Sequence, residues 1–189
     1  MSEQALLTRI VGALDRAGVP YMLTGSIVSS AQGVPRASHD VDIVISVTAA
    51  DAAGLVSALA APDLYLDERA VAEAVRRAST FNLIDPVTGD KADFWLLKDE
   101  EYDRERFARR TTIDALGLRL VVSAPEDTIL MKLRWSALSG GSQKQLDDAT
   151  GVYEFQGDVL DQGYLDRWAL ALDVADALAE VRRRATAPT

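Results

Sequence analysis

Residues 21–45, YMLTGSIVSSAQGVPRASHDVDIVI, decide the fold that the sequence predicts. A short apolar strand leads through a Thr-Gly-Ser turn into a helical segment, and a second strand then carries Asp40-Val41-Asp42. Because side chains alternate between the two faces of a strand, we expect Asp40 and Asp42 on one face and Val41 on the other. Two neighbouring carboxylates repel each other unless a positive group lies between them, and hard divalent cations prefer carboxylate oxygen. The pair therefore predicts a site for Mg²⁺ or Mn²⁺.

A third carboxylate follows on a later strand. Residues 80–84 and 91–97 are predicted strands, joined by the turn-rich sequence DPVTGD. Asp93 interrupts the apolar run of the second strand, where a charge is costly unless it is paired or bound to a metal. Three carboxylates on two strands are what a two-metal phosphoryl-transfer site requires. Trp95 is expected to fill the core, or alternatively to stack on a nucleobase.

The bulk properties exclude several classes of protein. The chain has 189 residues, no cysteine and one histidine, so disulfides, thiolate sites and multi-histidine zinc sites are excluded. Charged residues interrupt the first 18 residues, and no apolar run is long enough to cross a membrane, so we expect a cytoplasmic protein without a signal peptide. The net charge of −9 argues against a broad nucleic-acid-binding surface, although a small local patch is compatible with it.

The pattern along the chain changes near residue 124. Before it, helices are expected at residues 4–17, 67–78 and 99–110, and a further helix is expected after Thr48, which would cap it. A last strand is expected at residues 118–122. After it, apolar periodicity predicts helices at residues 126–138, 142–153 and 160–184. We therefore expect an α/β domain over residues 1–124 and a helical subdomain, packed on it, over residues 125–189.

Gly-Ser after a strand, followed by Asp-x-Asp at the start of the next and a third aspartate later, resembles the DNA polymerase β-like nucleotidyltransferase superfamily. The resemblance implies a mixed β-sheet flanked by helices, with an NTP as substrate and a divalent metal as cofactor. It implies Asp40, Asp42 and Asp93 as catalytic metal ligands. For the nucleotide it implies contacts from Gly25, Ser26, Arg36 and Ser38.

A second resemblance lies in the helical part. The run PEDTILMKLRWSALSGGSQKQLDD resembles bacterial nucleotidyltransferase-like proteins related to abortive-infection toxins, with Lys132 and Asp148 at the matching positions and Asp147 as an adjacent alternative. It implies that Lys132 reaches the β- and γ-phosphates and that Asp148 orients it. The alternative interpretation places Lys132 and Arg134 on the solvated side of a core helix.

Together these features predict transfer of NMP from an NTP to a hydroxyl group. By resemblance, the acceptor is a tRNA end or a protein, the role is that of a toxin, and a cognate antitoxin is a partner. Two alternatives stay open: a non-catalytic binding or antitoxin module with the same fold, and an aminoglycoside-type small-molecule nucleotidyltransferase. An intact acidic triad argues against the first alternative, and an acidic surface suits the polycationic substrate of the second.

Overall fold

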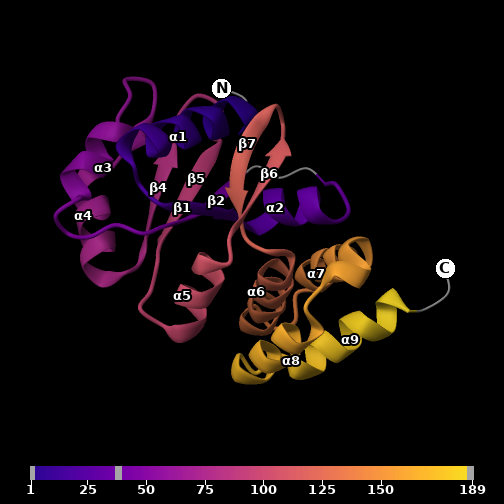
Figure 1. Ribbon diagram of the computed structural model, residues 1–189. Coiled ribbons are helices and arrows are strands. Elements are labelled where there is room, and N and C mark those ends of the chain that lie inside the picture. Colours follow the sequence, from indigo (N-terminus) through magenta and orange to yellow (C-terminus); the bar gives the residue numbers. More distant parts are fainter. Residues whose placement is uncertain (1–2, 37–39, 187–189) are drawn as a thin grey trace. The chain divides into compact units, whose positions relative to one another are not determined.

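A computed structural model describes residues 3–36 and 40–186 of the chain (Figure 1). The chain divides into two compact units, each of which is assembled from two segments. The first unit comprises Met1–Thr24 and Ala37–Val122, and the second comprises Gly25–Arg36 and Ser123–Thr189. None of the helices in the described ranges is long and apolar enough to span a membrane.

The first unit is built on one mixed sheet, with the strand order β3-β4-β5-β2-β1-β7-β6. Its strands are β1 (Tyr21–Thr24), β2 (Asp40–Ile45), β3 (Tyr65–Leu66), β4 (Thr80–Ile84), β5 (Lys91–Leu96), β6 (Thr111–Ala115) and β7 (Leu118–Val122). Strand β2 is antiparallel to β1 and parallel to β5, while β1 is parallel to β7. The predicted mixed sheet with flanking helices is confirmed.

One face of this sheet is apolar and carries the core. Val41 and Ile43 are two residues apart on β2 and Ile43 is in register with Phe94 of β5, so these three buried side chains point to the same side. The ring of Phe94 stacks on that of Phe81 with 4.7 Å between centroids. Helix α1 (Glu3–Ala17) packs on β2 and β5 with a fully buried apolar stripe. Burial of this face fixes the register of β2 and β5, because a slip of one residue would turn Val41, Ile43 and Phe94 to the opposite face.

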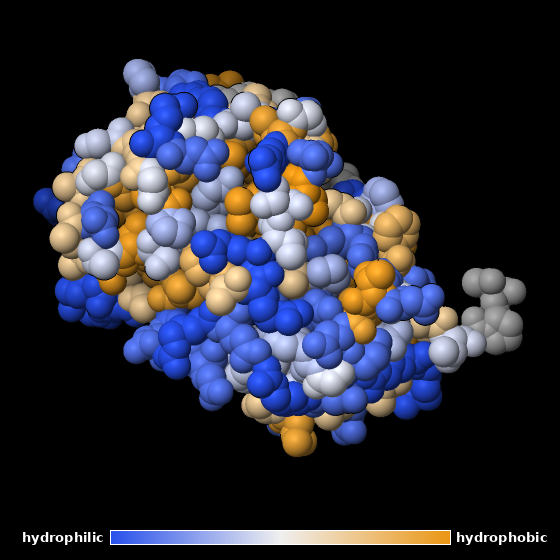
Figure 2. All heavy atoms as spheres, in the orientation of Figure 1, coloured by the Kyte–Doolittle hydropathy of each residue, from blue (hydrophilic) through white to orange (hydrophobic). Residues whose placement is uncertain are grey.

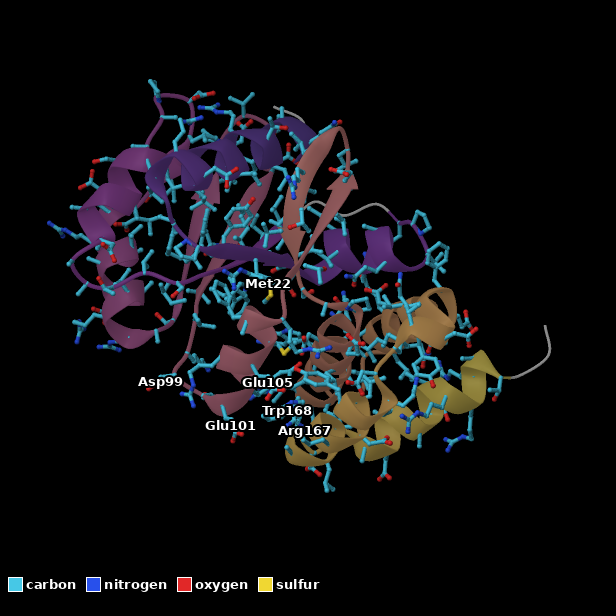
Figure 3. The ribbon with its side chains drawn as sticks, viewed as in Figure 1. Met22, Asp99, Glu101, Glu105, Arg167 and Trp168 are labelled. Carbon is cyan, nitrogen blue, oxygen red and sulfur yellow. The ribbon has the colours of Figure 1, made fainter. Side chains whose placement is uncertain are left out.

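The remaining helices of the first unit are α3 (Ala52–Leu59), α4 (Glu68–Arg77) and α5 (Glu101–Ala108). Asp67 caps α4 by accepting hydrogen bonds from two backbone N–H groups. The predicted cap at Thr48 is wrong: Thr48 donates to the Asp51 carboxylate in the preceding turn, and α3 begins only at Ala52. Phe107 of α5 packs with Met22 and Val44, and Figure 3 labels Met22 on β1.

Two hairpins complete the sheet. The predicted hairpin of β4 and β5 is confirmed, and the Asp85 side chain accepts from the backbone N–H groups of Val87 and Thr88 in its turn. The hairpin of β6 and β7 was not expected. Its two turn residues, Leu116 and Gly117, both have positive φ (56° and 73°), as a two-residue hairpin turn requires. A leucine there carries none of the usual sequence signal for such a turn, so β6 was missed.

The second unit is helical. Its helices are α2 (Gly25–Gln32), α6 (Pro125–Leu138), α7 (Gln143–Gln156), α8 (Gln162–Ala171) and α9 (Ala175–Ala185), with the 3₁₀ turn η1 (Gly157–Val159) between α7 and α8. Hydrophilic residues predominate over the C-terminal helices in Figure 2, with apolar ones scattered among them. Helix α2 belongs to this unit by its contacts with α6 and α7, although most of the first unit lies between them in the sequence.

A close backbone approach joins the end of α2 to α7. A Cβ atom added to Gly33 would lie 2.7 Å from the backbone nitrogen of Val152 and 2.8 Å from the carbonyl carbon of Gly151. Both neighbours are backbone atoms of a helix, so neither can move aside without shifting α7. The segment after α2 therefore requires glycine at this position.

We expect Gly33→Ala to lower the free energy of unfolding by about 1–3 kcal/mol, since the added methyl group overpacks the contact with α7. Gly54→Ala is the matched control, because Gly54 lies in α3 and a Cβ atom added there would meet nothing within 4 Å. This control should gain about 0.5–1 kcal/mol from its helix propensity. Urea denaturation measures both variants. A Gly33→Ala protein as stable as the parent would show that α2 and α7 are not held this closely.

Candidate functional site

The three predicted carboxylates lie on one face of two neighbouring strands. In the parallel pairing of β2 and β5, Asp42 is in register with Asp93, and Asp40 with Lys91. Partners in register share a face, and neighbouring strands are about 4.8 Å apart. The structure thus brings Asp42 and Asp93 side by side, with Asp40 two residues along the same face. Like charges directly opposite each other destabilise a sheet, so this arrangement calls for a cation.

Lys91 supplies one positive charge among these carboxylates. Its Nζ donates a hydrogen bond of 2.8 Å to Oδ2 of Asp93 and lies 3.6 Å from Oδ1 of Asp40. The hydrogen bond to Asp93 raises the pKa of Lys91 above its ordinary value, although burial acts in the opposite direction. Lys91 and Asp93 are two residues apart on one strand, so the alternation that groups the aspartates also places this lysine beside them. Lys91 was nevertheless not among the predicted site residues.

Two further details bear on whether the carboxylates fit a divalent metal. Trp95 Nε1 donates to Oδ1 of Asp42 at 3.3 Å, which orients that carboxylate. Oδ1 of Asp93 is buried and has no hydrogen-bond partner among the described residues. A buried carboxylate oxygen without a donor is costly, and a metal ion would satisfy it. The all-oxygen donor set also suits Mg²⁺ or Mn²⁺.

The side chains as they stand do not form a closed metal cage. Over residues 3–36 and 40–186, no three acidic or histidine side chains have the spacing of a metal-binding group. The residue types, their shared face and the unsatisfied Asp93 oxygen still fit a divalent cation that is coordinated after a small side-chain adjustment. That the three aspartates bind metal accordingly stays a prediction.

The other predicted site residues that the structure describes lie in the second unit. Gly25 opens α2 with a φ of +71°, a conformation that side-chain-bearing residues rarely adopt. It directly follows Thr24, the last residue of β1, which lies in register with Asp42. Ser26 Oγ accepts a hydrogen bond of 2.6 Å from Nη2 of Arg36. Ser38, the fourth residue of this predicted group, lies outside the described residues.

Asp148 on α7 joins two basic side chains. Arg36 donates to it from Nε at 2.8 Å and from Nη2 at 2.7 Å, a bidentate contact, and Lys132 Nζ on α6 donates at 2.7 Å. Charge-assisted and bidentate hydrogen bonds are the strongest that side chains form. This network links Ser26, Arg36, Lys132 and Asp148, all four of them predicted nucleotide-binding residues. No sequence pattern indicated that Arg36 contacts Asp148, since the two residues are 112 positions apart.

The pKa values follow from these contacts. Burial raises the pKa of Asp148, but the hydrogen bonds from Arg36 and Lys132 outweigh it and leave the pKa below its ordinary value. The hydrogen bond to Asp148 raises the pKa of Arg36 further. Asp148 and Arg36 are therefore both charged at neutral pH. In this basic cluster two basic side chains, Arg36 and Lys132, both donate to the one carboxylate of Asp148.

The structure decides two alternatives in the helical part. Lys132 is 5% exposed, so the interpretation that places it on the solvated side of a core helix is wrong. Of the two neighbouring aspartates, Asp148 contacts Lys132, whereas Asp147 is exposed and pairs with Arg184. Lys132 thus pairs with Asp148, and the nucleotide-binding role of the two residues stays a prediction. Trp95 is part of the apolar cluster with Met22, and the hydrogen bond from its indole N–H to Asp42 was not predicted.

Solved structures with a similar fold exist, although the other comparisons found no match. No protein-family model matches the sequence, and no curated protein matches it. Among solved structures, ANT(2″)-Ia in complex with adenylyl-2″-tobramycin aligns with a TM-score of 0.53 and 14% identity, covering 97% of this chain and 99% of that one. The solution structure of the antibiotic-resistance factor ANT(2″)-Ia gives 0.51 and 14%, covering 89% of this chain and 94% of that one.

An antigenic nucleotidyltransferase-like protein from Paracoccidioides brasiliensis aligns over 94% of this chain and 93% of that one, with a TM-score of 0.52 and 18% identity. Each alignment spans both the sheet and the C-terminal helices. At these identities the likeness concerns the fold. The chain has the fold of the nucleotidyltransferases.

Proposed function

We propose that the chain is a metal-dependent nucleotidyltransferase that moves NMP from an NTP to a hydroxyl group and releases pyrophosphate. The observation that carries the proposal is the register of β2 and β5, which sets Asp42 beside Asp93 on the face that also bears Asp40. In the reaction the acceptor oxygen bonds to the α-phosphorus, the bond from that phosphorus to the bridging oxygen breaks, and the acceptor hydroxyl gives up its proton.

In this proposal Asp40, Asp42 and Asp93 hold the divalent metal. When bound, the metal would polarise the α-phosphate and make the acceptor hydroxyl easier to deprotonate. The protein's own part is positioning, because the paired strands hold the carboxylates in place and Trp95 orients Asp42 before substrate arrives. A rigid arrangement of this kind needs little reorganisation during the reaction.

The triphosphate would be bound by the basic cluster of the second unit. Lys132 is an ammonium point charge with three donors, and Asp148 holds it in one position. Arg36 is fixed by Asp148 and Ser26, so its guanidinium is likewise ordered in advance. Gly25 and Ser26 begin a helix, whose first backbone N–H groups favour an anion.

Lys132→Met tests the phosphate contact. We expect the Kd for Mg²⁺–NTP to rise about tenfold, because one charge-assisted contact is lost. The melting temperature should change little, because methionine fills a similar volume and Asp148 keeps its bidentate contact with Arg36. Lys144→Met, on the exposed side of α7, is the matched control. A large loss of stability with unchanged NTP affinity would assign Lys132 a packing role only.

The first candidate for the acceptor is a macromolecule, either a tRNA end or a protein hydroxyl. The biological role would then be that of a toxin, with a cognate antitoxin protein as partner. The net charge of −9 favours a protein over a tRNA, because a polyanion would be repelled at long range and gripped only through local contacts.

A small polycationic acceptor is the second candidate. Two observations favour it: the acidic composition, which attracts such a molecule, and the solved structure of ANT(2″)-Ia with adenylyl-2″-tobramycin, which aligns over nearly the full length of both chains. This candidate uses the same carboxylates and the same bond changes, and it differs only in the acceptor.

A labelling experiment identifies the acceptor. The chain is incubated with each α-³²P-labelled NTP and Mg²⁺ or Mn²⁺, in the presence of separated RNA, protein and small-molecule fractions of a lysate. Label in RNA that is lost at raised salt supports the tRNA version, and label in a protein band supports the protein version. Label in a polycation of the small-molecule fraction, or in tobramycin added to a parallel reaction, supports the second candidate. No NTP binding at all would overturn the proposed activity in favour of a non-catalytic binding module.

A further inference from the structure

Lys91 approaches one oxygen of each of two proposed metal ligands, Asp93 and Asp40. Its Nζ lies 2.8 Å from Oδ2 of Asp93 and 3.6 Å from Oδ1 of Asp40. We propose that Lys91 is a displaceable internal counter-ion of the carboxylate site, which weakens divalent-metal binding by competing for these oxygens. The inference rests on the proposed function and adds a residue that sets how tightly its site holds the metal.

The geometry distinguishes Lys91 from an ordinary surface ion pair. In the sheet it is the register partner of Asp40, and it precedes Asp93 by two residues, so the backbone of β5 places the Lys91 side chain on the face that carries the carboxylates. Lys98, by comparison, lies beyond the strand and approaches Glu100 only to 3.9 Å, with both side chains about half exposed. Lys98 is therefore a suitable control for a nearby lysine without this position.

Displacement of Lys91 should be easy. Its side chain is 35% exposed and has a flexible four-carbon stem, so the ammonium can leave the carboxylates and be solvated without rearrangement of the sheet. Ion pairs exposed to this extent contribute little to stability. A divalent ion carries twice the charge and accepts several carboxylate oxygens at once, so it outcompetes the ammonium at a moderate concentration.

The same reasoning predicts what its removal does. Without Lys91, the carboxylates of Asp40, Asp42 and Asp93 keep their mutual repulsion and lose a competing cation. The metal-free protein should therefore become slightly less stable, and the affinity for the metal should increase. A purely structural ion pair would give the first effect without the second.

The test is direct titration of the full chain with Mn²⁺. Binding is measured as the loss of the free Mn²⁺ signal in electron paramagnetic resonance. We expect Lys91→Met to bind Mn²⁺ about tenfold more tightly than the parent, because a positive charge that contacts Asp93 and lies near Asp40, two of the proposed metal ligands, is removed. Lys91→Arg keeps the charge and should stay within about threefold of the parent. Lys98→Met should bind as the parent does. Lys91→Gln is titrated in parallel with the same expectation as Lys91→Met, in case the methionine impairs folding.

A second readout does not depend on the titration. The rise in melting temperature that Mn²⁺ produces should be larger in Lys91→Met than in the parent, because ligand stabilisation grows as Kd falls. Mn²⁺ affinity that is unchanged or weaker in both Lys91→Met and Lys91→Gln, while the parent binds Mn²⁺ and transfers nucleotide, would overturn this inference and leave the proposed function intact. If neither parent nor variant binds Mn²⁺, the proposed function fails and this inference fails with it.

Discussion

Asp42→Asn is expected to lower the rate of nucleotidyl transfer by about a thousandfold, the order of loss seen when a main electrostatic group of an active site is removed. Asparagine keeps the shape of the side chain and an oxygen that can still accept from Trp95 Nε1. It removes the negative charge that a metal requires. The free energy of unfolding should be unchanged or slightly higher, because the repulsion between Asp42 and its register partner Asp93 disappears.

Asp114→Asn is the control for this experiment. Asp114 lies exposed on β6 of the same unit, in register with Arg119, and has no part in the proposed site. Its transfer rate should equal that of the parent. Turnover is measured as pyrophosphate release, with thermal denaturation as the check on folding. An Asp42→Asn protein that keeps its rate within about threefold of the parent would show that these carboxylates do not carry the chemistry.

Asp148→Ala should produce the largest loss of stability among single changes to the basic cluster, about 3–5 kcal/mol. The reason is that Lys132 is 5% exposed and would remain as a buried charge without this carboxylate. Arg36 would lose both of its contacts to Asp148 at the same time. In a chain of this size the melting temperature should fall by roughly 10 °C.

The neighbouring residue offers a matched control. Asp147 is one position away on α7, but it is exposed, and its contacts with Arg184 and Gln143 lie at the surface. Asp147→Ala should therefore cost less than about 1 kcal/mol. The double variant Asp148→Ala with Lys132→Met removes the buried charge as well and should recover part of the loss. Equal and small effects of Asp147→Ala and Asp148→Ala would contradict the buried network.

The strand part of this architecture follows from local pattern. Alternation along β2 and β5 predicted the sheet face that carries Asp40, Asp42 and Asp93, because strand periodicity is a property of the backbone itself. The same rule applied to β5 also groups Lys91 with Asp93. Lys91 was missed because a lysine is not a metal ligand, so only the carboxylates were considered for the site. Strand alternation groups all polar residues of one face, whatever their charge.

Other features depend on contacts that no local pattern records. The Arg36–Asp148 pair joins residues 112 positions apart, and only the packing of α2 with α7 brings them together. Strand β6 was missed because its turn places Leu116, a residue without turn preference, at positive φ. The two-residue strand β3 is too short to show alternation. Burial of Lys132 likewise arises from tertiary packing, which overrides the usual preference of lysine for the surface.

In the proposed reaction the chain transfers the α-phosphoryl group of an NTP together with its nucleoside. Parallel reactions with α-³²P-labelled and γ-³²P-labelled NTP, each with Mg²⁺ and the acceptor fractions, test it most directly. We predict that the α-label enters the acceptor, that the γ-label is released as pyrophosphate, and that Asp42→Asn abolishes both. Transfer of the γ-label to the acceptor, or α-label transfer that continues at the parent rate in Asp42→Asn, would contradict it.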